Sequence, residues 1–171
     1  MNVEKHFEQA YLVKDWMQTD LKTIHPDTSL KDTVSIMIRE KTNGLVVVDD
    51  INHVVGIVSS WDIIKYIVPD YLEDDKHLAA FESADIFAKR IIGVENDTID
   101  KCMTKSVQVI GHDKPLMEVI ALLAEYHIRQ LPVVNEKNVL IGYLNRTDIK
   151  RAVWKVMQEH DACEHNEGQT V

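Results

Sequence analysis

The stretch LVVVDDINHVVGIVSSWDI, residues 45–63, decides the fold because its pattern returns 86 positions later in the chain. Residues 131–149 read LPVVNEKNVLIGYLNRTDI, and the gapless match extends back to pair residues 13–63 with 99–149. Eleven of these 51 pairs are identical, and the apolar positions stay in phase throughout. A match of this length predicts two copies of one structural unit.

Each copy predicts the element order β-α-β-β-α. A short extended piece leads through a turn to a helix whose apolar residues recur at helical spacing. Two β-branched runs follow, joined by a polar hairpin turn, and a second helix ends the unit. The expected strands and helix starts are Leu21–Ile24, Leu30, Leu45–Val48, Val54–Val58 and Trp61 in the first copy, and Val107–Ile110, Leu116, Leu131–Val134, Val139–Leu144 and Arg146 in the second. A unit of this size buries little surface alone, so the two copies are expected to share a core.

The repeats divide the chain into four predicted parts. Residues 1–68 hold a lead-in helix and the first repeat, and residues 98–157 hold the second repeat. Between them, residues 69–97 carry an acidic run and then apolar residues at roughly helical spacing, which favours a helix covering the module. A contact surface for a partner or a second subunit is the alternative for this insert. Residues 158–171 read as a polar tail that is expected to fray.

Composition excludes several classes of protein. The 171 residues are 45% hydrophobic and 27% charged, which is ordinary for a globular protein, and their formal net charge of -9 argues against nonspecific nucleic-acid binding. No apolar run approaches the ~20 residues of a membrane-spanning helix, and the N-terminus has no apolar core of signal-peptide type. We therefore expect a cytoplasmic protein without nucleic-acid or membrane partners. His160, Cys163 and His165 lie close in sequence, but accident is a better explanation than a metal site.

Several short segments resemble CBS domains. These are the openings Val13–Met17 and Ile99–Met103, the strand Leu131–Val134, and the segment Gly56–Asp62. The resemblance covers roughly residues 12–68 and 98–157. It implies an α/β fold in which tandem CBS repeats pack as a pseudo-twofold pair, the Bateman module, with the helical insert between them.

The same resemblance implies a regulatory module that senses an adenosyl ligand in the cleft between the repeats. AMP, ADP or ATP comes first, S-adenosylmethionine remains possible, and no cofactor or metal is required. The resemblance also implies a homodimer formed through the helices, with output through a separate effector protein. The alternative is a non-catalytic scaffold that has lost nucleotide binding. An enzyme is not expected, because the chain lacks the GxGxxG, Walker A, HExxH and GxSxG motifs.

The ligand is expected at the junction between the last strand and the last helix of each repeat. A helix N-terminus favours phosphate, and glycine lets a ligand approach the backbone. Ser59-Ser60-Trp61-Asp62 is similar to the family's Ser/Thr-x-x-Asp motif, which places Ser59 on a phosphate or ribose oxygen and Asp62 on the ribose. The second copy keeps Asp148 but replaces the hydroxyl residue. The residues implied to bind ligand are Thr23, His25, Gly56, Ser59, Ser60, Asp62, Val109, His112, Arg129, Pro132, Asn145, Arg146 and Asp148.

Each of these signals also has a purely structural interpretation. Ser59 with Asp62, and Asn145 with Asp148, resemble helix-capping pairs that need no ligand. The two roles are compatible, because a capping aspartate can still present an outer oxygen to a ribose. Arg129 is either a phosphate contact, whose counterpart in the first copy is Asn43, or an ordinary surface arginine.

Overall fold

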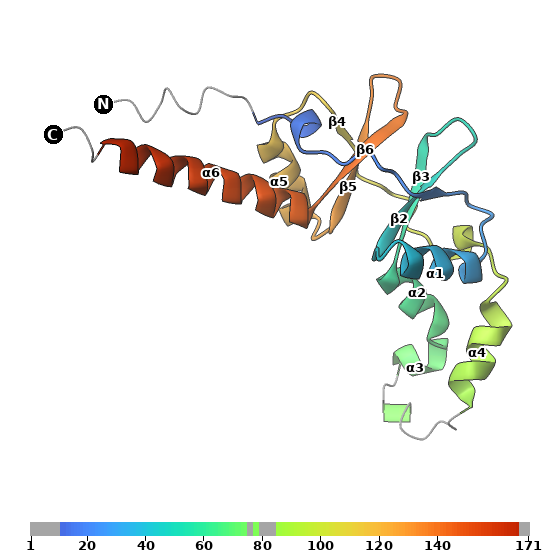
Figure 1. The fold of residues 1–171 in the computed structure, drawn as a ribbon. Helices are drawn as coiled ribbons and strands as arrows, with labels where there is room; N and C mark the ends of the chain where they lie inside the picture. Colours follow the sequence, from blue (N-terminus) through green and yellow to red (C-terminus); the bar gives the residue numbers. More distant parts are fainter. Residues whose placement is uncertain (1–10, 75–76, 79–84, 168–171) are drawn as a thin grey trace. The chain divides into compact units, whose positions relative to one another are not determined.

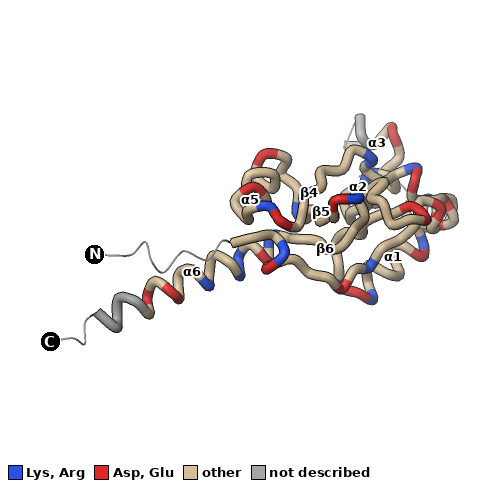
Figure 2. Tube along the Cα trace, turned by 90° about the horizontal axis from the view of Figure 1, so that it is seen from above, with Lys and Arg blue, Asp and Glu red and all other residues tan. Residues whose placement is uncertain are grey.

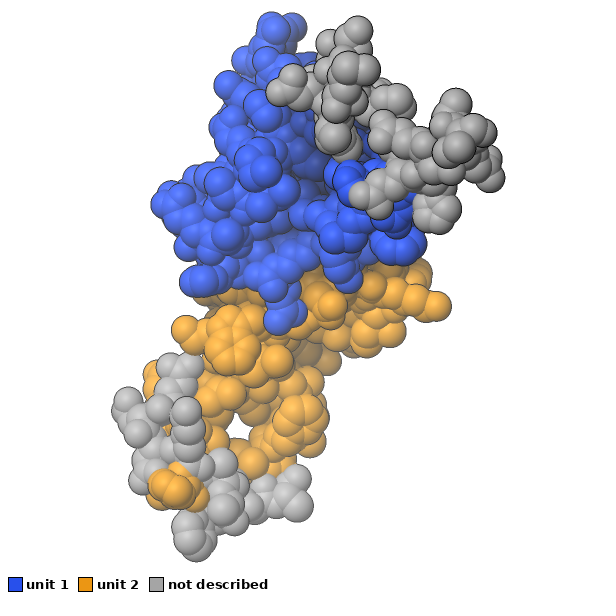
Figure 3. Space-filling view, turned by 90° about the vertical axis from the view of Figure 1, so that its left-hand side faces the viewer, with its two compact units in different colours: residues 1–21, 108–171 blue, residues 22–107 orange. Residues whose placement is uncertain are grey.

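The computed structural model describes residues 11–74, 77–78 and 85–167 (Figure 1). The chain forms two compact units, coloured separately in Figure 3. Unit 2 is the continuous stretch of residues 22–107, and unit 1 combines residues 1–21 with residues 108–171. The expected lead-in helix falls almost wholly outside the described residues.

Unit 2 contains most of the first repeat, the insert and the opening of the second repeat. Its elements are β1 (Thr23–Ile24), α1 (Leu30–Arg39), β2 (Gly44–Val48), β3 (Val54–Ser59), α2 (Ser60–Ile67), α3 (Asp70–Asp74), α4 (Ile86–Val94) and the 3-10 turn η4 (Ile99–Lys101). The sheet has the order β1-β2-β3, with β1 parallel and β3 antiparallel to β2. The helix side of this sheet is buried in a core that includes Ile24, Val47 and Val58. The order β-α-β-β-α predicted for the first repeat is therefore confirmed.

Unit 1 repeats this arrangement. Its elements are the 3-10 turn η2 (Val13–Asp15), β4 (Ile110–Gly111), α5 (Leu116–Glu125), β5 (Gln130–Val134), β6 (Leu140–Asn145) and α6 (Arg146–Glu167). The sheet order β4-β5-β6 and its strand directions match those of unit 2. The tail expected to fray is instead helical as far as Glu167, and α6 continues beyond α5 in Figure 1. Acidic and basic residues are interspersed along α6 (Figure 2), and Lys155 pairs with Glu159 one turn on.

The hairpin turns of the two units use the same side-chain chemistry. Asp49 Oδ1 accepts hydrogen bonds from the backbone amides of Ile51 and His53, at 3.0 and 2.8 Å. Asn135 Oδ1 does the same for the corresponding turn of unit 1. The left-handed position of each turn is an asparagine, Asn52 with φ 62° and Asn138 with φ 60°. Asparagine tolerates this conformation well, so these residues fix both hairpins.

Each unit is completed by a lead-in segment from the start of the other repeat, residues 97–104 in unit 2 and residues 11–18 in unit 1. In unit 2, Ile57 and Thr104 exchange backbone hydrogen bonds of 3.0 and 2.9 Å. In unit 1, Gln18 and Tyr143 exchange equivalent bonds of 2.9 and 3.0 Å. Ile99 and Val13, which belong to these lead-in segments, are fully buried in the cores of units 2 and 1 respectively.

A tyrosine–carboxylate hydrogen bond joins each lead-in segment to a helix of its unit. The tyrosine lies on the helix in unit 2 and on the lead-in segment in unit 1. In unit 2, the hydroxyl of Tyr66 on α2 donates to Asp97 at 2.8 Å. In unit 1, the hydroxyl of Tyr11 on the lead-in segment donates to Glu159 on α6 at 3.0 Å.

The insert is fastened to the end of α2. The guanidinium of Arg90 on α4 donates to the carbonyls of Tyr66 and Ile67, at 2.9 and 3.0 Å. These carbonyls lack partners within α2, so the arginine caps the helix C-terminus. Phe87 and Ile92 on α4 remain exposed, and Phe81 lies outside the described residues.

Candidate functional site

The two motif aspartates lie in the first turn of the helix that follows the last strand of each unit. The backbone amide of Ser59 donates to Asp62 Oδ2 at 2.7 Å, and the amide of Asp62 donates to Ser59 Oγ at 3.3 Å. In unit 1, the amide of Asn145 donates to Asp148 Oδ2 at 2.9 Å, and the amide of Asp148 donates to Asn145 Oδ1 at 3.2 Å. The capping interpretation is thus confirmed in both copies, because each pair satisfies amides at the helix start.

The Asp62 site, made of Ser59, Asp62 and Thr104, has unused hydrogen-bonding capacity. Asp62 is partly exposed, and its Oδ2 accepts from both the amide and the hydroxyl of Ser59. Its Oδ1 accepts only from the Thr104 hydroxyl, at 3.3 Å, among the described residues. A carboxylate offers about four acceptor positions, so Oδ1 can still accept a hydroxyl from a ligand.

A row of side chains flanks the Asp62 site on the outer face of the sheet. Thr23 pairs with Val46, Val46 with Ile57, and Ile57 with Thr104. Residues in cross-strand register point to the same face, and the neighbouring residues Ile24 and Val47 face the core. Thr23 and Ile57 therefore lie on the face of the sheet that carries Thr104, away from the helices of unit 2.

The Asp148 site, made of Gln18, Tyr143, Asn145, Asp148 and Arg151, is closed by its own side chains. Asp148 is only 1% exposed. Gln18 Nε2 donates to both carboxylate oxygens, at 2.8 and 3.0 Å, and Arg151 Nη1 donates to Oδ1 at 3.1 Å. Tyr143 donates its hydroxyl proton to Gln18 Oε1 at 2.8 Å. The pKa of Tyr143 is raised by burial and then by the negative charges of Asp148 and Asp20.

The two predicted phosphate-binding arginines have different surroundings. Arg146 is exposed but donates to the carbonyls of His127 and Ile128, each at 3.1 Å, so its guanidinium supports the loop before β5. Arg129 is exposed, and in the described part of the chain its side chain makes no hydrogen bond or ion pair. Only Arg129 thus has a guanidinium without a structural partner there, and its phosphate role stays a prediction.

Gly56 and Gly142 occupy the same position of the two repeats, and each leaves room for a methionine side chain. A side chain on Gly56 would place its Cβ 2.5 Å from the Met103 sulfur, and one on Gly142 would lie 2.8 Å from the Met17 sulfur. The glycines thus let the lead-in segments pack closely against β3 and β6. This packing gives the repeated glycine a structural reason, and ligand contact at Gly56 stays a prediction.

The remaining predicted residues are divided between the units. Ser60 lies at the start of α2, where its hydroxyl donates to the Asn43 carbonyl at 3.4 Å, and His25 is exposed in the turn before α1. In unit 1, Val109 and His112 lie on either side of β4, and Pro132 is buried in β5 opposite Tyr143. Their roles as ligand contacts stay predictions.

Sequence reasoning missed Gln18 and Thr104. They are equivalent positions in the repeat and directly follow the identical pair Met17 and Met103. The available signal was the change from a short hydroxyl to a long amide at one repeat position. Its meaning depends on the pairing of each lead-in segment with the other repeat, which the sequence does not display.

Burial and charge set the local electrostatics of unit 2. Burial is the main cause that raises the pKa of the Cys102 thiol to about 11, with further contributions from the negative charges of Asp62, Asp100 and Asp97. This thiol is therefore protonated at neutral pH and is a poor nucleophile or metal ligand.

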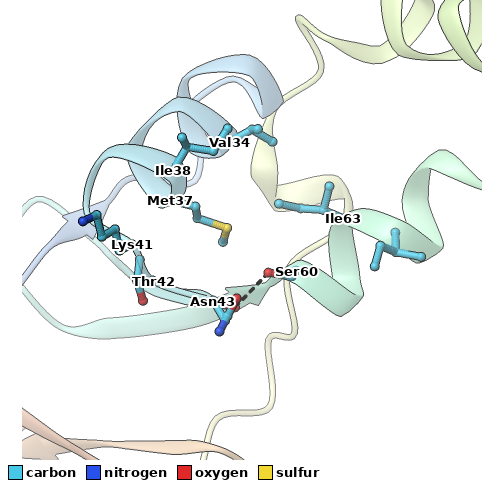
Figure 4. Close-up of a pocket in the computed structure, with 9 residues that line it drawn as sticks. Val34, Met37, Ile38, Lys41, Thr42, Asn43, Ser60 and Ile63 are labelled. Atoms are coloured by element: carbon cyan, nitrogen blue, oxygen red, sulfur yellow. Dashed lines mark hydrogen bonds between the residues drawn. The ribbon is translucent and has the colours of Figure 1, made fainter.

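A groove on the helix side of unit 2 is separate from the Asp62 carboxylate. It lies between α1 and α2 and has a volume of about 480 Å³. Figure 4 shows Val34, Met37 and Ile38 lining it from α1 and Ile63 from α2. The lining is mainly apolar, and the groove has no carboxylate, so it suits an apolar side chain better than a ribose.

Two negative findings apply to the part of the chain that the structure describes. None of its helices is long and apolar enough to cross a membrane. It also contains no group of three or more His, Cys, Asp and Glu side chains arranged to hold a metal ion. The side chains of Cys163 and His165 lie outside that part.

Comparison with known proteins identifies the repeats. The family model described as "CBS domain" matches residues 13–69 and 97–155. The CBS domain-containing protein CBSX2 of Arabidopsis thaliana, a chloroplastic protein, is 29% identical over 158 residues, which cover 88% of this chain and 66% of that protein. L-aspartate semialdehyde sulfurtransferase of Methanocaldococcus jannaschii is 27% identical over 140 residues, covering 82% of this chain but only 23% of the enzyme. The chain therefore spans less than two thirds of each of these relatives.

Solved structures share the fold. CBSX2 in complex with AMP matches with a TM-score of 0.66 and 29% identity, covering 86% of this chain and 98% of that one. The CBS domain pair of protein MJ0100, in complex with 5′-methylthioadenosine and S-adenosyl-L-methionine, matches with a TM-score of 0.65 and 26% identity over 86% of this chain and 98% of that one. Because the family model covers both repeats and these pairs share their architecture, the chain belongs to the CBS-domain family, as a tandem pair of CBS repeats.

Proposed function

We propose that this chain is a regulatory module that binds an adenosyl ligand through the ribose at Asp62. The observation that carries the proposal is the free acceptor capacity of Asp62 Oδ1, on a carboxylate already held in place by Ser59. Ribose presents two adjacent hydroxyl donors, and hydrogen bonds to a charged acceptor are stronger than neutral ones. The AMP and S-adenosylmethionine complexes of CBSX2 and MJ0100 support the ligand class.

Regulation by such a ligand follows from differential affinity. The ligand shifts the population toward the conformation that binds it better, and a separate effector protein reads this change. The chain acts in this proposal as a sensor and not as an enzyme. AMP, ADP, ATP and S-adenosylmethionine are the candidate ligands, in the cytoplasm, with no cofactor required.

The proposal includes a homodimer formed through the helices. Large apolar side chains are exposed on both units: Ile38 and Trp61 on α1 and α2, and Met117 and Trp154 on α5 and α6. Exposed apolar side chains of this size favour a protein–protein contact. These surfaces also favour the second candidate function, a scaffold that docks a partner without binding nucleotide.

A thermal-shift series with AMP, ADP, ATP, S-adenosylmethionine and 5′-methylthioadenosine tests the sensor against the scaffold. Ligand at 100 times its dissociation constant stabilises the folded state by about 2.7 kcal/mol, which raises the melting temperature measurably. Guanosine monophosphate is the matched control, because it carries the same ribose and phosphate but a different base. No shift with any adenosyl compound at millimolar concentration would reject the sensor. Light scattering coupled to size exclusion tests the dimer separately.

A further inference from the structure

We propose that Gln18 acts as a built-in latch that occupies the Asp148 site, so that the chain binds one adenosyl ligand, at the Asp62 site. This inference rests on the proposed function and deepens it by assigning the number of ligands and the residue that sets it. It also explains why the carboxylate that both repeats retain has a different role in each.

The first step is the acceptor count at Asp148. Its Oδ1 accepts from Gln18 and Arg151, and its Oδ2 accepts from Gln18 and the amide of Asn145. Four hydrogen bonds from these three groups use the roughly four acceptor positions of a carboxylate. A ribose hydroxyl therefore has to displace a hydrogen bond that already exists, and the burial of Asp148 excludes approach without such a displacement.

The second step is that Gln18 is held on both sides. Its backbone pairs with Tyr143 through two hydrogen bonds, and its side-chain oxygen accepts from the Tyr143 hydroxyl at 2.8 Å. With the oxygen facing this hydroxyl, the amide nitrogen faces Asp148, where it donates to both oxygens. Tyr143 thus positions the latch, and the Gln18 side-chain nitrogen makes the two hydrogen bonds that a ribose would otherwise make.

The third step is the counterpart in unit 2. Thr104 pairs with Ile57 through the same two backbone hydrogen bonds, so its side chain starts from the equivalent place. Its hydroxyl is shorter than the glutamine amide and reaches a single oxygen of Asp62, at 3.3 Å. Ile57, which replaces Tyr143, has no hydroxyl to hold a longer side chain. The Asp62 site therefore lacks both parts of the latch.

Reciprocal substitutions in the full chain test the proposal by titration calorimetry, with AMP and 5′-methylthioadenosine as separate probes. We expect the native chain to bind one molecule of a probe per chain. Gln18→Thr should raise this number to two, because it gives the Asp148 site the side chain of the open one. The double variant Thr104→Gln with Ile57→Tyr should bind at least tenfold more weakly than the native chain, because it builds the latch over Asp62.

Tyr143→Phe provides a second route that leaves Gln18 and Asp148 in place. It removes only the hydroxyl that holds the latch, so a second, weaker site should appear even if Gln18→Thr fails to fold. Circular dichroism and thermal unfolding verify the fold of each variant. Two sites in the native chain, or one site in folded Gln18→Thr and Tyr143→Phe, would overturn the latch and leave the sensor function intact. No binding of either probe by any of the four proteins would reject the sensor function and the latch together.

Discussion

The Asp62 and Asp148 sites share a backbone frame and differ in what surrounds the carboxylate. The positive-φ positions recur 86 residues apart, Lys41 with His127 and Asn52 with Asn138, and both sites have a capped helix start. Yet Asp62 is partly exposed with an available oxygen, whereas Asp148 is buried and accepts four hydrogen bonds from three groups. The duplicated units thus keep the same backbone and core, while a few side chains around the aspartate close the Asp148 site and leave an acceptor oxygen available at Asp62.

The largest expected effect separates the two aspartates by stability. Asp148→Ala removes the acceptor of Gln18, Arg151 and the Asn145 amide, and should lower the free energy of unfolding by about 3 kcal/mol. Asp62→Ala removes mainly a helix cap and should cost about 1 kcal/mol. Urea unfolding of the two variants measures both values. Equal losses would show that burial does not distinguish the sites.

The second effect concerns AMP affinity, for which the Asp62 variant should lose more than the Asp148 variant. Asp62→Ala should weaken AMP binding by about 2 kcal/mol, roughly thirtyfold, because a charged acceptor of the ribose is lost. Asp62→Asn is the matched variant that keeps the shape and weakens binding less. Asp148→Ala should change affinity little at temperatures where it remains folded. A larger loss in Asp148→Ala than in Asp62→Ala would assign the ligand to unit 1 and support a role for Arg129.

The third effect compares the two glycines. Gly142→Ala should destabilise the protein by about 1–3 kcal/mol, because the new Cβ would lie 2.8 Å from the Met17 sulfur and 3.0 Å from the Gln18 carbonyl oxygen. Gly56→Ala should cost less, because its close contacts are all to the flexible Met103 side chain. Thermal unfolding of both variants measures this difference. A rescue of Gly56→Ala by Met103→Ala, without a rescue of Gly142→Ala by Met17→Ala, would confirm that the backbone contact decides it.

The smallest expected effect is a pH dependence of stability that arises from Asp97 in unit 2. Hydrogen bonds from Lys101 and then Tyr66 hold the pKa of Asp97 below its ordinary value. A lowered pKa means that Asp97 stabilises the fold above about pH 4, and that this contribution is lost as the pH falls through the lower folded-state pKa. The stability difference between the native chain and Asp97→Asn should therefore be present at pH 6 and shrink toward pH 2. A difference that stays constant over this range would contradict the role of the ionised group.

Much of this architecture was predictable from the sequence because its causes are local. Apolar periodicity located the helices and strands of the repeats within a few residues, and the spacing of Ser59 and Asp62 predicted a helix cap. The prediction of a frayed tail after residue 157 was wrong, because α6 extends to Glu167 through a stretch without a strong apolar pattern. Gln18 could not be assigned, because its role depends on contacts with Tyr143 and Asp148 more than 120 positions away. Local pattern predicts elements, whereas the closing of a site depends on which distant segments meet.

The exchanged lead-in segments give the chain an order of assembly during synthesis. Unit 2 is continuous, so all of its partners exist once residue 107 has left the ribosome. The segment around Val13 and Gln18 is made first, but its partner strand β6 ends only at Asn145. At about 5–20 residues per second, the first-made segment waits for several seconds after the last residue of unit 2 has been made. Unit 2, with the partly exposed Asp62, is therefore complete in sequence before unit 1 can bring Gln18 onto Asp148.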